Sequence, residues 1–475
     1  MAKNATPTPR VGVVGAGASG LYAARHLRDC GLDVVVFEQR DVLGGIWNYS
    51  ADQATGPCTY KSLRTNLPTE VMQVPGMRCA PRVGSYPTHA EMLATLETYA
   101  QDFASIDCIR FSTTVRFITK TMDGEAWQIT VAPAGGDAYI ETVDRVVVCN
   151  GHCTVPNMPD IPGMRHITGN ILHSRDYRTP DRFLGQPLIP VASTAGHDIS
   201  LELAAHGAAQ VTVAVRDHDK RIVKPAIERI ELDEDTATAL IVFEDGTTMP
   251  EPDVTMFCTG YRHAVHSLLP NDLLFPNAVA DERGFDRSGS YNLAKLVEAA
   301  SRHEVVAPLY RHVFAIQDPT IAFIGLSKRT ITLMCFELQA QWVARVFAGL
   351  LKLPNRAEMY ESLASDMVMC EARKEPLRMF HCLGTQQKDY FSFLASQVTA
   401  ELPEVLEEMF VDSAILMFKC PEFYRSVIFA RDPATNKWIR TLQVPATKEA
   451  AARTDLRVFG EPYVNPFYQQ PESSS

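Results

Sequence analysis

Several features that define large protein classes are missing from the sequence. No apolar run approaches the roughly 18 residues of a membrane-spanning helix, so we expect no transmembrane segment. Basic residues are not in excess, because 45 of the 475 residues are Lys or Arg and 56 are Asp or Glu, for a formal net charge of −11. Since nucleic-acid binding needs a basic face, we expect no nucleic-acid partner. The first ten residues lack the apolar stretch of a secretory signal, which favours a cytoplasmic protein.

The cysteines lack the spacing of a redox or zinc motif. Eleven of them are scattered between positions 30 and 420, and no two form a C-x-x-C pair. This pattern argues against a thioredoxin-like dithiol and against an ordinary zinc knuckle, so we expect no metal site. It is typical of the reduced thiols of an intracellular protein.

What the sequence does contain begins with a complete β-α-β unit. Hydrophobic residues make up 46% of the chain, which is enough for a large core. Residues 10–14 (RVGVV) predict a buried strand, residues 21–30 predict a helix, and residues 33–37 (DVVVF) predict a second strand. Residues 15–20 read G-A-G-A-S-G, which is the spacing of a dinucleotide-binding loop in its expected context.

Each residue type in this loop has a physical reason. Gly15 permits the tight turn, Gly17 lets the backbone approach a pyrophosphate, and Gly20 lets the helix pack close to the strand. The N-terminus of the helix presents unpaired N–H groups and a partial positive charge to phosphates. Glu38, which is 18 residues beyond Gly20, can accept hydrogen bonds from a ribose. The candidate cofactor-binding residues of this unit are Gly15, Gly17, Ala18, Ser19, Gly20, Glu38 and Gln39.

Two further motifs give the sequence a family resemblance. Residues 44–47 read G-G-I-W, and the pair Thr65-Asn66 precedes a proline-rich stretch. Together with the glycine loop, these motifs resemble the class B flavoprotein monooxygenases, and specifically the flavin-containing monooxygenase (FMO) family. The resemblance implies FAD as cofactor, held in part by Gly45, Ile46, Trp47 and Thr65. It also implies that Asn66 contacts the flavin near its C4a position, where oxygen is activated, and is the catalytic residue.

The middle of the chain extends the resemblance. Residues 111–115 resemble the strand whose backbone contacts adenine in the family, which makes Val115 a candidate cofactor-binding residue. Residues 167–177 resemble the FMO identifying motif: Gly169, His173 and Tyr177 match it, and Ile167 replaces its phenylalanine. We interpret His173 as an organiser between two nucleotide domains and not as a base.

The second glycine loop of the family, which binds NADPH, is altered in this chain. Ala192 stands where the first glycine belongs, the loop is one residue short, and Pro190 removes a donor from the predicted central strand. A Cβ at the turn and a displaced helix N-terminus both weaken phosphate binding. Ser193 and Thr194 stay candidates, and Arg216 lies where the family places a basic residue for the 2′-phosphate. The resemblance thus implies NADPH as a second cofactor, and the altered loop opposes it.

The resemblance also implies a fold. It is an α/β fold with two dinucleotide-binding (Rossmann-like) domains, the smaller inserted in the FAD domain, and a largely helical C-terminal segment. We expect the first part of the FAD domain in residues 1–170 and the inserted NADPH-binding-like domain in residues 171–304. Residues 305–475 would complete the FAD domain and add a helical segment on the substrate side. The Met and aromatic residues of 357–440 predict either core or a hydrophobic substrate pocket.

The function that the resemblance implies is FAD-dependent monooxygenation. NADPH reduces FAD, and O2 then forms a C4a-hydroperoxyflavin that oxygenates a nitrogen, sulfur or activated carbon of a small, lipophilic metabolite. The altered second loop supports an alternative, an NADPH-independent oxidase in which the substrate reduces the flavin and O2 reoxidises it. A third reading is a flavin-bound scaffold without catalysis. The expected partners are a small-molecule substrate and O2, and the oligomeric state is left open.

Overall fold

Two compact units make up the chain in the computed structural model. Unit 1 comprises Met1–Asn48, Arg64–Gly151 and Ala264–Ser475, and unit 2 comprises Tyr49–Leu63 and His152–His263. The expected domain boundaries near 170 and 304 stay a prediction. The structure describes residues 8–79, 84–103, 105–191, 194–214, 223–233, 235–236, 238–270, 293–402, 405–419, 424–444 and 453–459.

A seven-stranded sheet forms the centre of unit 1, in the order β19-β20-β21-β7-β1-β2-β3. Its five neighbouring strands from β21 to β3 run parallel, and β20 and β19 continue the sheet in antiparallel fashion. The predicted strands at residues 10–14 and 33–37 are confirmed as β1 and β2, which pair in register from Arg10↔Asp33 to Val14↔Phe37. The strands are β1 (Arg10–Val14), β2 (Asp33–Phe37), β3 (Ile109–Arg110), β7 (Arg145–Val148), β19 (Leu309–Tyr310), β20 (Phe314–Ala315) and β21 (Ile321–Phe323).

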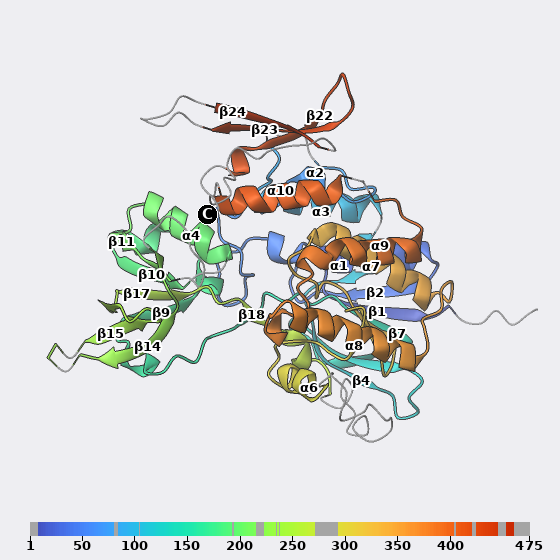
Figure 1. Cartoon of the computed structure of the whole chain (residues 1–475). Helices are drawn as coiled ribbons and strands as arrows, with labels where there is room; N and C mark the ends of the chain where they lie inside the picture. Colours follow the sequence, from blue (N-terminus) through green and yellow to red (C-terminus); the bar gives the residue numbers. More distant parts are fainter. Residues whose placement is uncertain are drawn as a thin grey trace, which may run out of the picture. The chain divides into compact units, whose positions relative to one another are not determined.

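Both faces of this sheet are buried, so its strands are apolar almost throughout. Successive residues of a strand point to opposite faces, and Val11 and Val13 accordingly pack in a different cluster from Val14. The first cluster lies under helices α1 (Ala18–Asp29), α3 (His89–Asp102) and α7 (Thr332–Phe347). The second lies against the antiparallel sheet of β4 (Thr113–Lys120), β5 (Trp127–Pro133) and β6 (Tyr139–Val143) (Figure 1).

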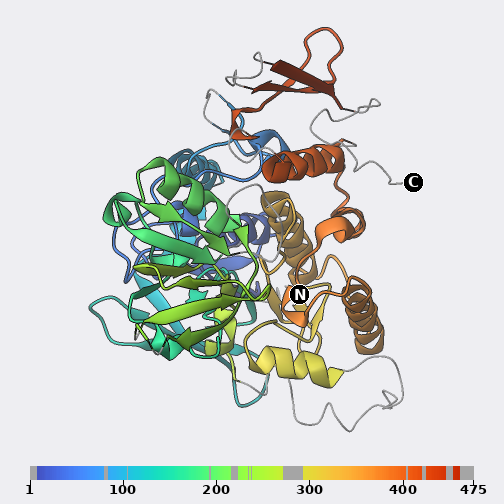
Figure 2. The same cartoon turned by 60° about the vertical axis from the view of Figure 1, so that its left-hand side comes forward.

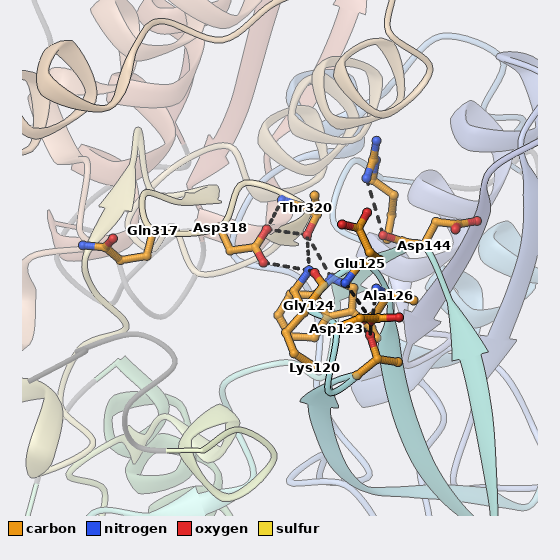
Figure 3. A network of polar contacts seen from close by, with 12 residues as sticks. Lys120, Asp123, Gly124, Glu125, Ala126, Asp144, Gln317, Asp318 and Thr320 are labelled. Atoms are coloured by element: carbon orange, nitrogen blue, oxygen red, sulfur yellow. Dashed lines mark hydrogen bonds and ion pairs between the residues drawn. The ribbon is translucent and has the colours of Figure 1, made fainter.

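A polar network joins this antiparallel sheet to the late strands of the central sheet (Figure 3). Lys120 Nζ lies 2.8 Å from Asp318 Oδ2 and donates to Thr320 Oγ1 at 3.2 Å. Trp127 Nε1 donates to the same hydroxyl at 2.9 Å. The network therefore fastens the loop before β21 to strands made some 190 residues earlier, because Trp127 and Thr320 are 193 positions apart.

Unit 2 is built around its own parallel sheet, in the order β13-β12-β10-β17-β9, with β11 also paired to β10. Pro190 lies inside β10 and faces Met256 of β17, so the predicted central strand forms despite the proline. Antiparallel β14, β15 and β16 form a second sheet, and β8 pairs with β18. The elements are β8 (Val155–Pro156), β9 (Asn170–His173), β10 (Pro187–Val191), α4 (Thr194–Ala205), β11 (Gln210–Val211), β12 (Val213–Ala214), β13 (Val223–Lys224), β14 (Ile227–Leu232), β15 (Ala239–Phe243), β16 (Thr248–Pro250), β17 (Val254–Phe257) and β18 (Tyr261–Arg262).

The C-terminal part of unit 1 is helical as predicted, but it ends in a sheet that the sequence analysis did not predict. Besides α7, its helices are α6 (Leu293–Ser301), α8 (Arg356–Ala372), α9 (Gln387–Val398) and α10 (Leu406–Lys419). The short helix α2 (Thr69–Met72) belongs to an earlier part of unit 1. The sheet is antiparallel, with β22 (Ile428–Arg431), β23 (Trp438–Val444) and β24 (Arg453–Val458), and lies beside α10 in both views (Figures 1 and 2). Arg440 of β23 and Asp412 of α10 form a fully buried ion pair at 2.9 Å, which ties the sheet to the helix. No helix in the described part of the chain is long and apolar enough to cross a bilayer.

Candidate functional site

The glycine loop between β1 and α1 has the geometry that its sequence predicts. Gly15 adopts a φ of +100°, and a Cβ there would lie 2.6 Å from the carbonyl oxygen of Cys149. A Cβ on Gly20 would lie 1.9 Å from the carbonyl oxygen of Gly15, so the helix can start this close to the strand only with glycine. Helix α1 begins at Ala18, and the buried Ser19 lies in its first turn. The loop thus places the N–H groups of a helix N-terminus at the carboxyl end of β1.

Gly17 and the segment after β2 approach each other across this loop. A Cβ on Gly17 would lie 3.6 Å from the Cα of Gly45, and a Cβ on Gly45 would lie 3.0 Å from the Cα of Gly17. Gly45 begins the short 3-10 helix η1 (Gly45–Trp47), in which Ile46 is 41% exposed and Trp47 packs partly against the core. The two glycines therefore leave a strip of bare backbone that side chains would fill.

Glu38 lies at the end of β2 and is almost fully buried. Its Oε2 accepts the N–H of Ala16 at 2.8 Å, and its Oε1 accepts the N–H of Arg40 at 3.0 Å. Burial raises the pKa of Glu38, and these hydrogen bonds oppose the shift. The adjacent Gln39 is exposed. The backbone N–H of Thr113 donates to the carbonyl of Glu38 at 2.8 Å, so β4, which contains Val115, starts beside the predicted ribose acceptor.

Thr65 and Asn66 differ in their surroundings although they are neighbours. The Oγ1 atom of Thr65 is buried, and the described part of the chain offers it no hydrogen-bond partner. Asn66 is exposed, and its Oδ1 accepts from Arg425 Nη2 at 2.8 Å and from the Tyr424 hydroxyl at 3.3 Å. The sequence analysis did not predict the two donors, Tyr424 and Arg425, because no local motif marks them.

The predicted NADPH residues are only partly described. Ala192, Ser193 and Arg216 lie outside the described residues. Thr194 is the first residue of helix α4, which follows β10 as the family's second nucleotide unit requires. The structure therefore supplies the strand and the helix of this unit, and the role of its loop stays a prediction.

His173, the matched histidine of the identifying motif, is buried in unit 2. Its Nδ1 accepts the N–H of Arg175 at 3.1 Å, and its Nε2 lies 3.0 Å from the carbonyl oxygen of Gly260. Because a backbone N–H must donate and a carbonyl must accept, Nε2 carries the proton. Burial lowers the pKa of His173, which favours the neutral ring. These contacts fit a structural residue and give it no path to act as a base.

A second cluster in unit 2 contains Cys58, which the sequence analysis did not single out. The thiols of Cys58 and Cys153 are hydrogen-bonded, and Cys58 also bonds to the Tyr261 hydroxyl. These bonds lower the pKa of Cys58 to about 7 against the effect of burial. Arg175 holds the two cysteine-bearing segments together, since its guanidinium donates to the carbonyls of Gln53 at 2.8 Å and Thr154 at 3.1 Å.

Comparisons with known proteins show what the chain resembles. A family model described as flavin-binding monooxygenase-like matches residues 8–227 and 290–453. The chain is 32% identical over 453 residues to the flavin-containing monooxygenase FMO GS-OX3 of Arabidopsis thaliana, covering 89% of this chain and 92% of the relative. It is 33% identical over 443 residues to FMO GS-OX-like 2 of the same plant, covering 85% and 88%.

The solved structures that resemble the chain have the same fold. S-allyl-L-cysteine S-oxygenase from Allium sativum matches with a TM-score of 0.76 and 28% identity, covering 88% of this chain and 95% of that one. Tmm from Pelagibacter sp. strain HTCC7211 matches with a TM-score of 0.71 and 21% identity, covering 90% and 95%. At that identity the second match shows the fold alone.

Proposed function

Because the chain belongs to the flavin-binding monooxygenase-like family and is a flavin-dependent oxidoreductase, we propose that it oxygenates a small molecule with FAD, NADPH and O2. One observation carries the proposal. The bare backbone at Gly17 and Gly45 occurs in the same unit as a buried Thr65 hydroxyl that has no partner among the described residues. Such a hydroxyl costs free energy unless a ligand completes its hydrogen bonding.

The residues present fit FAD. Gly17 leaves room for a pyrophosphate at the N-terminus of α1, and the Glu38 carboxylate offers lone pairs to ribose hydroxyls. Thr65 can donate its free hydroxyl, and the exposed Ile46 offers an apolar surface to the isoalloxazine ring. When bound, FAD would supply the redox chemistry: with a hydride from NADPH and a proton, it would allow one oxygen atom of O2 to pass to the substrate while the other leaves as water.

The chain's own contribution is then binding, orientation and hydrogen bonding. Asn66 would donate from Nδ2 to an oxygen atom near the flavin, because its Oδ1 is already occupied by Arg425 and Tyr424. Trp47, which packs partly buried against the core, would help to exclude water from the flavin. We assign no general base, since His173 is buried and bound on both ring nitrogens.

For the substrate we propose the sulfur of a small thioether. The support is the similarity to a solved S-oxygenase over 88% of this chain. A thioether sulfur is a soft nucleophile and needs no deprotonation before oxygen transfer, which agrees with a site without an assigned base. Tertiary amines and ketones are the competing substrate classes for this family, and their products differ from a sulfoxide.

The experiment that tests the proposal is anaerobic reduction followed by oxygen. The purified flavoprotein is mixed with NADPH without O2, and bleaching of the visible flavin band is followed. Fast bleaching, and then a sulfoxide from a panel of alkyl and allyl thioethers in air, is the expected result. An N-oxide or an ester as the favoured product would overturn the substrate class.

The altered second loop favours one alternative function. Ala192 replaces a glycine at the predicted turn, and Pro190 lies inside β10. If NADPH cannot bind, an FAD oxidase remains, in which the substrate itself reduces the flavin and O2 is converted to hydrogen peroxide. Absence of bleaching by NADPH and NADH, combined with bleaching by a substrate, would select this alternative.

A further inference from the structure

A segment near the C-terminus reaches the predicted catalytic asparagine within unit 1. Arg425 Nη2 donates to Asn66 Oδ1 at 2.8 Å, and Arg425 Nε donates to the carbonyl oxygen of Thr65 at 3.1 Å. The Tyr424 hydroxyl donates to the same Oδ1 at 3.3 Å. Three hydrogen bonds from two consecutive residues therefore converge on the Thr65-Asn66 pair.

The donor segment is itself fixed in the protein. Tyr424 and Arg425 lie in the 3-10 helix η10 (Tyr424–Ser426), and Tyr424 is only 1% exposed. Its ring meets that of Tyr86 edge to face, with centroids 5.5 Å apart. Three residues after η10, the N–H of Phe429 donates to Ser85 Oγ at 2.9 Å. The segment is thus anchored to residues 85–86, and the N–H of Thr65 bonds to the neighbouring carbonyl of Pro87 at 2.9 Å.

The chemistry of an amide makes this arrangement directional. An asparagine side chain has an acceptor oxygen on one side and two N–H donors on the other. A guanidinium can only donate, so Arg425 selects one of the two orientations that a rotation of the amide would exchange. The Tyr424 hydroxyl can donate or accept, and it donates to the amide oxygen in that orientation. A charged donor makes the stronger bond of the pair. The Nδ2 group is then presented as a donor on the opposite side.

We infer that Tyr424 and Arg425 are positioning residues, which hold the Asn66 amide with its N–H donors available for an oxygen atom at the flavin. The inference rests on the proposed function, because it assigns Asn66 to the flavin. It adds that two residues some 50 positions before the end of the chain contribute to the active site. It also distinguishes the pair from a simple structural link, because the effect of the pair should require the Asn66 amide.

A double-mutant cycle tests this requirement. Tyr424→Phe removes the hydroxyl donor and keeps both the aromatic ring and the neighbouring Arg425 charge. Arg425→Ala removes the charged donor. Each variant is also combined with Asn66→Ala. Arg431→Ala is the matched control, because this exposed arginine of β22 bonds to the Asn436 carbonyl and lies over Trp438. The two readouts are the Kd for FAD, by flavin fluorescence on the apoprotein, and the peroxide released per NADPH consumed.

The expected result is loss of additivity. Arg425→Ala should raise the peroxide fraction and weaken FAD binding by about tenfold, and Tyr424→Phe by about two- to threefold, which are ordinary values for one charged and one neutral hydrogen bond. In the Asn66→Ala background Tyr424→Phe should have no further effect, and Arg425→Ala should keep only the smaller effect of its bond to the Thr65 carbonyl. An undiminished effect of either variant in that background, or an effect that Arg431→Ala reproduces, would overturn the inference and leave a structural link.

The two proposals fail in different ways. If NADPH does not reduce the flavin of the unaltered protein, the proposed function is wrong. The FAD-affinity cycle still decides the positioning role in that case, because it needs no turnover. If reduction and oxygenation proceed normally while the cycle is additive, only the positioning role is wrong.

Discussion

Gly17 and Gly45 face each other so closely that a Cβ on the second would lie 3.0 Å from the Cα of the first. The contact joins the glycine loop after β1 to the segment after β2, and both residues come from motifs that sequence alone identifies. Because neither has a side chain, both fit the close backbone approach that the proposed FAD site requires.

We expect Gly17→Ala to separate folding from FAD binding. Gly17 has a φ of −76°, which alanine adopts easily, and a Cβ there meets nothing closer than 3.6 Å. The free energy of unfolding of the apoprotein should change by less than about 1 kcal/mol. The added methyl group would cover backbone that the proposed pyrophosphate must approach, so the Kd for FAD should rise at least about tenfold.

Gly20→Ala is the matched control for that variant. Its Cβ would lie 1.9 Å from the carbonyl oxygen of Gly15, so the backbone must shift. We expect destabilisation by more than about 3 kcal/mol in urea unfolding, with loss of FAD as a consequence. A Gly17→Ala protein that keeps its FAD would show that the loop does not hold the pyrophosphate.

Glu38→Gln should weaken FAD binding more than it changes stability. Both carboxylate oxygens of Glu38 accept a backbone N–H, so an amide nitrogen would face a donor on one side, which costs about 1–3 kcal/mol. Because burial raises the pKa of Glu38, the neutral amide recovers some of the cost of the buried charge. The two effects oppose each other in the apoprotein. In FAD binding, by contrast, no second effect offsets the loss of the carboxylate as hydrogen-bond acceptor for the proposed ribose. Fluorescence titration should therefore show a Kd for FAD about tenfold higher.

The ion pair of Lys120 and Asp318 should stabilise unit 1 at neutral pH. Burial alone would raise the pKa of Asp318, but hydrogen bonds from Lys120 and Thr320 outweigh it and lower the pKa. Asp318→Ala should therefore cost about 1–3 kcal/mol in urea unfolding at pH 7. A depressed carboxyl pKa contributes stability above its unfolded value, near about 4, and loses it as the pH falls through the folded value. The difference between the two proteins should accordingly shrink below about pH 4, and a constant difference would contradict this assignment.

Cys58 should react with iodoacetamide at unusually low pH. Its hydrogen bond with Cys153 lowers the pKa of Cys58 to about 7, whereas a free thiol titrates near about 8.5. Because the thiolate is the reactive form, the alkylation rate of Cys58, followed by mass spectrometry of its peptide, should rise with a midpoint near pH 7. Cys153→Ala should move this midpoint upward. A midpoint near 8.5 in the unaltered protein would contradict the hydrogen bond.

Local sequence signals predicted the parts of the fold that depend on local chemistry. Strands β1 and β2 begin and end at the predicted residues because both faces of each are buried and turn residues flank them. Helix α1 ends at Asp29, and Gly31 follows it with a φ of +79°. The glycine loop was predictable for the same reason, since its residue types reflect contacts within 30 positions.

Contacts between distant residues were beyond the sequence signals. Arg425 and Asn66 are 359 positions apart, and neither an arginine nor a tyrosine near the C-terminus indicates its partner. The placement of residues 49–63 in unit 2 could not be predicted for the same reason. It depends on contacts between distant residues, such as that of Tyr60, which packs edge to face on Tyr177. Strand β22 and the start of β23 fall in the stretch 357–440, whose Met and aromatic residues indicate composition and not a period of two. Strand β24 lies beyond that stretch, where the sequence analysis predicts no strand.

The order of the central sheet has a consequence for synthesis on the ribosome. Strand β7 ends at Val148, but its outer neighbour β21 is made only at residues 321–323. At a synthesis rate of about 5–20 residues per second, roughly 10–35 s pass between completion of β7 and synthesis of β21, and the outer edge of β7 is unpaired during that time. An open edge of this kind can pair with another chain, so the nascent protein is exposed to aggregation during that interval. Chains that terminate early, before residue 321, should therefore be insoluble even though every residue of the glycine loop is present.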